Sequence, residues 1–234
     1  MRCIQPSNIV GVIGPLVTAV HLILFDIDGT LVDSADYESE LYSQAIAEVL
    51  PMPFERDWSR YQNVTDSGIL DEIIDASDTE SDRDDIHRRV KEIFIQKTGR
   101  HFAEKPNSIQ EIDGAKSLID RLRDMDSCAI GIATGGWDDT ARLKLAGIGV
   151  DLAGIALATG SDATRRTEIM QIAEARALNG KSPDQRTYFG DRVWDKLASE
   201  DLGFDFIAVG NAVSHSTAFA DLRGHEEIFR QLGI

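Results

Sequence analysis

The chain has 234 residues, of which 42% are hydrophobic and 27% are charged, a composition that excludes overall disorder and suits one core with a small accessory domain. Its formal net charge of -16 makes nucleic acids and anionic membranes unfavourable partners, because such a surface repels phosphate groups. The two cysteines, Cys3 and Cys128, cannot form a disulfide framework or a cysteine-rich metal site, so we expect a cytoplasmic environment.

The first twenty residues contain an apolar run at 9–20 that is interrupted by Gly11, Gly14 and Pro15. This run is too short to span a bilayer, and no basic cluster precedes it. We therefore expect an irregular arm or an over-long start here rather than a cleaved signal peptide. We expect no membrane span elsewhere in the chain.

The rest of the chain alternates between apolar runs typical of strands and amphipathic segments typical of helices. Residues 20–27 form a continuous apolar run, as in a strand buried on both faces of a parallel sheet. Further strands are expected at 128–133, 154–158, 187–190 and 206–209, and helices at 114–124, 138–146, 166–178 and 193–201. Residues 34–110 have helical periodicity without a convincing strand. The order predicts an α/β protein with a doubly wound parallel-sheet, Rossmann-like core of residues 1–33 and 111–234, and an inserted helical domain at 34–110.

Two groups of polar residues follow the first two predicted strands, at the sheet edge where ligands bind in such folds. Asp26 and Asp28 stand one residue apart in the run DIDGTLVDS, and their mutual repulsion favours a bound cation such as Mg²⁺. Thr134 precedes two glycines, and its hydroxyl with the adjacent backbone N–H groups can cradle an anion.

Two more groups follow later strands. Arg165 and Arg166 begin a predicted helix, where a cation opposes the helix dipole unless an anion lies nearby. The run GDRVWD places Asp191 and Asp195 at another strand end.

In this order and spacing, DIDGTLVDS, the threonine after an apolar strand and GDRVWD resemble the haloacid dehalogenase superfamily, in particular its phosphoglycolate-phosphatase-like members. The resemblance implies that Asp26 is a nucleophile that becomes an aspartyl-phosphate. It implies that Asp28 is first a general acid and then a general base, and that Thr134 holds a phosphoryl oxygen. Because Asp28 must be protonated when the alcohol leaves, we expect its pKa to be raised by Asp26 or by burial.

The same resemblance implies a Mg²⁺ cofactor. Its ligands would be Asp26, the backbone carbonyl of Asp28, Asp191, and Asp195 directly or through water. The family's cation is usually a lysine, often followed by proline, whereas this chain has Arg165 and Arg166. Both stay candidates for the phosphate-binding cation, and Arg166 has the better spacing to the apolar residues that follow.

The insertion at 34–110 resembles the family's helical cap, which would exclude water and restrict substrates to small molecules. Its polar candidates for substrate contact are Arg60, Tyr61, Asn63, Thr65 and Asp66. Thr65 or Asp66 could instead cap a helix that begins near Gly68. We expect the acidic segment 75–85 to be a solvated loop between helices, and Trp137 and Trp194 to be packing residues.

Together these features predict a Mg²⁺-dependent phosphomonoester hydrolase that acts on a small phosphorylated metabolite through an aspartyl-phosphate. Two alternatives stay open: a sugar phosphomutase of the same superfamily, and a catalytically silent protein that binds metal or phosphate.

Overall fold

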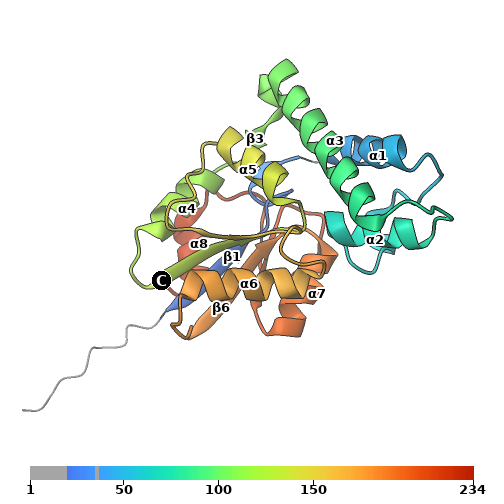
Figure 1. The fold of residues 1–234 in the computed structure, drawn as a ribbon. Helices are drawn as coiled ribbons and strands as arrows, with labels where there is room; N and C mark the ends of the chain where they lie inside the picture. The colour runs from blue at the N-terminus through green and yellow to red at the C-terminus, as the bar shows by residue number, and fades with distance from the viewer. Residues whose placement is uncertain (1–19, 35–36) are drawn as a thin grey trace, which may run out of the picture.

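The computed structural model describes residues 20–34 and 37–234, so the predicted arm at 1–19 lies outside the described residues. The chain forms a parallel sheet with helices on both faces, and three further helices lie to one side (Figure 1). Six strands in the order β5-β4-β1-β6-β7-β8 make up this sheet, and all their pairings are parallel. The predicted α/β fold class is confirmed.

The strands of the large sheet are β1 (His21–Phe25), β4 (Cys128–Ala133), β5 (Ala156–Ala158), β6 (Gln185–Gly190), β7 (Asp205–Val209) and β8 (Ala218–Phe219). The helices are α1 (Glu38–Val49), α2 (Asp66–Asp75), α3 (Arg83–Glu104), α4 (Ala115–Arg123), α5 (Asp138–Gly147), α6 (Arg166–Leu178), α7 (Val193–Leu202) and α8 (His225–Leu232). Two short 3-10 helices complete the set: η1 (Trp58–Arg60) lies between α1 and α2, and η2 (Pro106–Ser108) follows α3.

The central strand β1 is buried on both faces, which explains its continuous apolar sequence. Because side chains alternate along a strand, Ile23 and Phe25 join the apolar cluster under α4, α5 and α8. Leu22 and Leu24 join the opposite cluster, which is covered by α6 and α7. Two packed layers therefore hold the carboxyl end of β1 in place.

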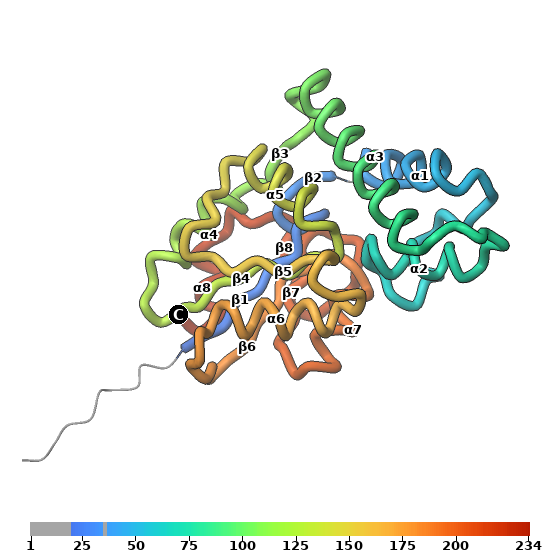
Figure 2. The backbone as a smooth tube through the Cα atoms, viewed as in Figure 1, coloured from blue at the N-terminus to red at the C-terminus, as the bar shows by residue number. Residues whose placement is uncertain are grey.

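Helices α1, α2 and α3, with the segments that join them, are called the cap from here on. They surround an apolar cluster of their own, separate from the two clusters of the core. One core residue, Trp137, lies inside this cluster and is only 2% exposed. The tube in Figure 2 shows the cap beside the sheet edge at which α2 approaches the core. The domain boundaries 34 and 110 stay a prediction.

Two short strands connect the cap to the core. They are β2 (Val32–Asp33) and β3 (Gln110–Glu111), which pair antiparallel. The sequence did not predict them, because two residues are too few to show a periodic pattern. The last elements, β8 and α8, were also not predicted. Within 20–34 and 37–234, every helix is too short or too polar to cross a lipid bilayer.

Candidate active site

The loop after β1 brings the first acidic pair to the centre of the sheet edge. Asp26 directly follows β1 and is only 4% exposed. Gly29 in the same loop has a φ of +81°, and a Cβ atom there would lie 2.2 Å from Asp191 Oδ2. Only glycine fits at this position, so the loop after β1 can pack directly against the loop after β6.

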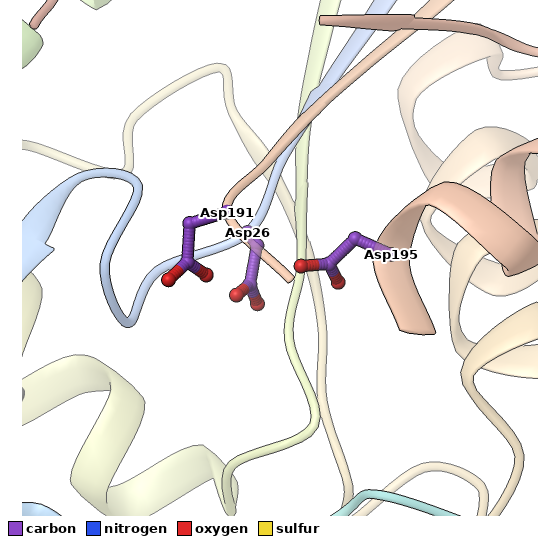
Figure 3. A group of neighbouring side chains, drawn as sticks. All are labelled: Asp26, Asp191 and Asp195. Atoms are coloured by element: carbon purple, nitrogen blue, oxygen red, sulfur yellow. The ribbon is translucent and has the colours of Figure 1, made fainter. Parts of the chain in front are cut away.

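Three carboxylates converge where these loops meet. Figure 3 shows Asp26 between Asp191, from the loop after β6, and Asp195, from α7. One oxygen of each lies within 4.8 Å of the other two, and all three side chains are buried. Burial and the charge of Asp195 raise the pKa of Asp26 to about 7, and burial with the charges of Asp195 and Asp26 raises the pKa of Asp191 to about 8. The cluster therefore takes up protons unless another cation neutralises it.

The donor set of this cluster fits a divalent metal ion. Asp191 Oδ1 is buried and has no hydrogen-bond partner within the described part of the chain. A buried carboxylate oxygen without a donor is costly, and a cation held by oxygen ligands removes that cost. Carboxylates are also the ligands that Mg²⁺ prefers over softer nitrogen and sulfur donors. Asp195 has one oxygen less available as a metal ligand, because its Oδ2 accepts a hydrogen bond from the backbone N–H of Arg192 at 3.0 Å.

The guanidinium of Arg166 faces the nucleophile candidate Asp26. Arg166 begins α6, and its Nη1 lies 2.9 Å from Asp195 Oδ1 and 3.4 Å from Asp26 Oδ1. Arg165, in contrast, is exposed. The structure thus places Arg166 in the site and Arg165 outside it. A cation at the start of a helix opposes the helix dipole unless an anion lies nearby, and the carboxylates of Asp26 and Asp195 are these anions.

The prediction of a raised pKa for Asp28 is wrong in this structure. Burial acts to raise the pKa of Asp28, but the charge of Lys144 and its hydrogen bonds outweigh it and lower the pKa below the usual value. Lys144 Nζ donates to both carboxylate oxygens of Asp28, at 2.7 and 2.8 Å. Lys144 thus favours the ionised form of Asp28, whose carboxylate does not belong to the group of three that converge.

Thr134 follows β4 and is 2% exposed at the same sheet edge. Its Oγ1 accepts a hydrogen bond from the Gly136 N–H at 3.3 Å. The glycine loop needs close backbone contacts, because a Cβ at Gly160 would lie 2.3 Å from the Gly135 oxygen. The Thr134 hydroxyl thus lies against the glycine loop that follows it, and the anion cradle stays a prediction.

A cavity of about 470 Å³ opens between the sheet edge and the cap. Its lining residues from the core include Asp26, Asp28, Thr134, Arg166 and Trp194, and those from the cap include Glu38, Tyr42, Thr65 and Asp66. Three predicted cap candidates, Arg60, Tyr61 and Asn63, do not line it. Other residues of the same segment before α2 do line it, namely 56–59 and Val64.

The start of α2 is hydrogen-bonded to the core. Thr65 Oγ1 caps the helix by accepting from the Gly68 N–H at 3.0 Å, and it donates to the Thr164 carbonyl at 2.7 Å. Asp66 Oδ2 accepts from the Trp137 N–H at 2.9 Å. The capping interpretation of Thr65 is confirmed, while Asp66 faces the cavity.

The sequence analysis also made predictions for two tryptophans and for the acidic segment 75–85. Trp137 is a packing residue as predicted, whereas Trp194 is only half-buried and lines the cavity. The acidic segment lies largely in the exposed loop between α2 and α3, as predicted.

The sequence analysis missed several residues of the site, among them Glu38, Lys144 and Tyr188. Tyr188, on β6, donates to the Ala133 carbonyl at 2.8 Å and accepts from Arg166 Nη1 at 3.3 Å. A usable signal existed only for Lys144, which lies on the apolar face of α5 with buried neighbours one turn away. A charged residue on such a face needs a buried partner.

Comparison with known proteins agrees with this architecture. The family model for haloacid dehalogenase-like hydrolases matches residues 23–209. A hydrolase from Pseudomonas syringae has a similar structure, with a TM-score of 0.69 and 20% identity over 89% of this chain and 97% of its own. CbbY from Rhodobacter sphaeroides, in complex with phosphate, gives a TM-score of 0.66 and 16% identity over 88% and 96% of the two chains.

A predicted phosphoglycolate phosphatase from Haemophilus somnus gives a TM-score of 0.62 and 18% identity over 91% and 99%. No curated protein sequence matches this chain. At these identities the structural neighbours show the fold, while the family model spans most of the chain. The chain is therefore an enzyme of the haloacid dehalogenase-like hydrolase family.

Proposed function

We propose that this chain is a Mg²⁺-dependent phosphatase that hydrolyses the phosphomonoester of a small metabolite. The observation that carries the proposal is the placement of Asp26, whose carboxylate faces the cavity with Arg166 Nη1 at 3.4 Å. A cavity of about 470 Å³ admits a small molecule and not a macromolecule. The negative charge of the chain and its two cysteines support a cytoplasmic location within the same proposal.

In the first step the Asp26 carboxylate attacks phosphorus, so that an oxygen–phosphorus bond to Asp26 forms while the bond to the alcohol oxygen breaks. Arg166 offsets the repulsion between the carboxylate and the phosphoryl group. The Thr134 hydroxyl is placed to donate to a phosphoryl oxygen. A Mg²⁺ ion held by Asp26, Asp191, Asp195 and the backbone carbonyl of Asp28 would add positive charge against that group.

Asp28 handles the protons of both steps. In the first step the leaving alcohol oxygen takes a proton from the protonated form of Asp28. In the second step water attacks phosphorus and gives a proton to Asp28, while the bond between phosphorus and the Asp26 oxygen breaks and inorganic phosphate leaves. The charge of Lys144 lowers the pKa of Asp28 and so favours its ionised form, which is the form that the second step needs. Burial and the charge of Asp28 also raise the pKa of Glu38, the other partner of Lys144, well above its usual range.

The test is release of inorganic phosphate from a panel of small phosphomonoesters, with and without Mg²⁺, by the wild type and by Asp26→Asn. We expect metal-dependent release that the variant loses by at least ~1,000-fold, because the substituted amide is a poor nucleophile. Rearrangement of a sugar phosphate through a bisphosphate, without net phosphate release, would favour the phosphomutase alternative. Metal binding without turnover of any compound would favour the silent binding protein.

A further inference from the structure

A buried lysine connects the catalytic loop to the cap. Lys144 lies on α5, and its side chain is 1% exposed. Its helical neighbours on the same face, Ala141 and Leu145, pack in the core. The ammonium group must therefore find its partners inside the protein, because no water shell is available there.

Both partners are carboxylates, and they belong to different parts of the molecule. Lys144 Nζ donates to both oxygens of Asp28, at 2.7 and 2.8 Å, in the loop after β1. It also forms an ion pair with Glu38, the first residue of the cap helix α1. A carboxylate bound through both oxygens to one ammonium has a fixed orientation.

Stability alone explains this arrangement poorly. Burying one ammonium and two carboxylates costs desolvation free energy that the mutual attraction recovers only in part. A second cation that joins cap and core, Lys91, pairs with the exposed Asp139 at 2.8 Å and touches no residue of the acid cluster. The Lys144 cluster instead fixes the one acid that the proposed reaction uses for proton transfer.

We propose that Lys144 is a positioning residue, which holds the Asp28 carboxyl group at the leaving oxygen. Through its contact with Glu38, it makes the position of that carboxyl group depend on how α1 packs against the core. The inference rests on the proposed function. Proton transfer by a side chain is effective only within hydrogen-bond reach of the reacting oxygen. Movement of α1 with Glu38 would change the partners of Lys144 and thus the position of Asp28.

The experiment compares two substrates that differ in their need for a proton. An alkyl phosphate from the panel releases a basic alkoxide unless Asp28 protonates it, whereas p-nitrophenyl phosphate releases a weakly basic phenolate. We measure kcat/KM, which reports the steps through departure of the leaving group. Lys144→Met is expected to lower kcat/KM for the alkyl phosphate about 100-fold and for p-nitrophenyl phosphate about fivefold or less.

Lys91→Met is the matched control, since it also removes a lysine that joins cap and core. It should leave the ratio of the two kcat/KM values unchanged. Glu38→Gln and the double variant complete a double-mutant cycle. If Lys144 and Glu38 act as a unit, the effects of the two substitutions on kcat/KM for the alkyl phosphate are not additive. Should Lys144→Met fail to fold, Glu38→Gln carries the comparison, with selective loss on the alkyl phosphate expected.

Equal losses on the two substrates would overturn the inference, because a merely structural role lowers both alike. Additive effects of the two substitutions would overturn the link to the cap. A wild type without phosphatase activity would contradict the proposed function, and this inference with it. An active wild type with equal losses in the variants would contradict this inference alone.

Discussion

The floor and the cap side of the cavity are built on opposite principles. The floor consists of buried charges: Asp26 and Asp195 face the guanidinium of Arg166, and Asp191, which completes the group of three acids, pairs with Arg192. The cap side near α2 is held mainly by neutral hydrogen bonds and aromatic packing. Charges that are buried and unbalanced bind cations and anions strongly, whereas neutral contacts form and break at little cost. The floor is suited to the reaction, and the cap to selecting and enclosing the substrate.

The two regions meet at the segment between Thr134 and α5. Trp137 enters the cap cluster, where its ring lies 5.8 Å from that of Tyr42 and 6.2 Å from that of Phe94. About two helical turns further along, Lys144 binds Asp28 of the floor. A single stretch of the core therefore contacts both the cap and the catalytic loop. Substitutions on the floor should change the chemical step, and substitutions on the cap side should change stability and KM.

The largest expected effect is on the floor, at Arg166. Arg166→Met leaves Asp26 and Asp195 without their cation, so we expect kcat/KM to fall ~1,000-fold. Arg166→Lys keeps the charge but not the planar guanidinium with its paired N–H donors, and we expect kcat/KM to fall roughly tenfold. Arg165→Met is the matched control and should leave kcat/KM unchanged. An Arg166→Met enzyme with nearly full activity would remove Arg166 from the mechanism.

At the boundary between the regions, Trp137→Ala should act mainly on stability. It deletes a buried indole from the cap cluster, and we expect the free energy of unfolding to fall by about 3 kcal/mol. Trp137→Phe keeps the aromatic packing but loses the hydrogen bond from Nε1 to Ser67 Oγ at 2.8 Å. We expect this loss to lower the free energy of unfolding by about 1 kcal/mol. Urea unfolding measures both, and KM should rise more than kcat falls. A variant that lost kcat while keeping its stability would contradict the division between floor and cap.

On the cap side, Asp66 gives a pH dependence. Burial raises the pKa of Asp66 to about 7, from a usual value of 3.8. Between these pH values the unfolded chain loses a proton that the folded protein keeps, so the free energy of unfolding falls as pH rises and levels off above the folded pKa. Because the carboxyl is partly open to the cavity, we expect a contribution on the order of 2 kcal/mol.

Asp66→Asn isolates this contribution from the other acids. The amide oxygen can still accept from the Trp137 N–H, but it does not titrate. Relative to this variant, the wild type should be less stable at pH 8 than at pH 5. A stability difference that is the same at both pH values would show that the pKa of Asp66 is not raised.

The fold was largely predictable because its signals are local. The apolar run at 20–27 contains β1, and the helix expected at 166–178 has the bounds of α6. What escaped prediction was short or late in the chain: β2 and β3 have two residues each, and their pairing depends on where the cap leaves and re-enters the core.

The acids of the floor also give a local signal, because they lie in short motifs: Asp26 and Asp191 follow strand ends directly, and Asp195 lies four residues after Asp191 at the start of α7. Lys144 was not predicted, since its partner Asp28 lies 116 residues away in the sequence. The pKa of Asp28 was consequently predicted in the wrong direction. A long-range contact between a helix and a loop leaves no local pattern except a charge on an apolar face.

The smallest effect is expected at Tyr188, another residue of the site that the sequence analysis did not predict. Tyr188 is fully buried in β6, and its hydroxyl lies between the Ala133 carbonyl and Arg166. Tyr188→Phe removes this hydroxyl without changing the ring, so we expect a loss of about 1 kcal/mol in unfolding free energy. Since Arg166 keeps both carboxylate partners, kcat/KM should fall only about threefold. A loss near that of Arg166→Met would mean that Tyr188, and not the carboxylates, sets the position of the guanidinium, and the floor would then depend on a neutral hydrogen bond as the cap side does.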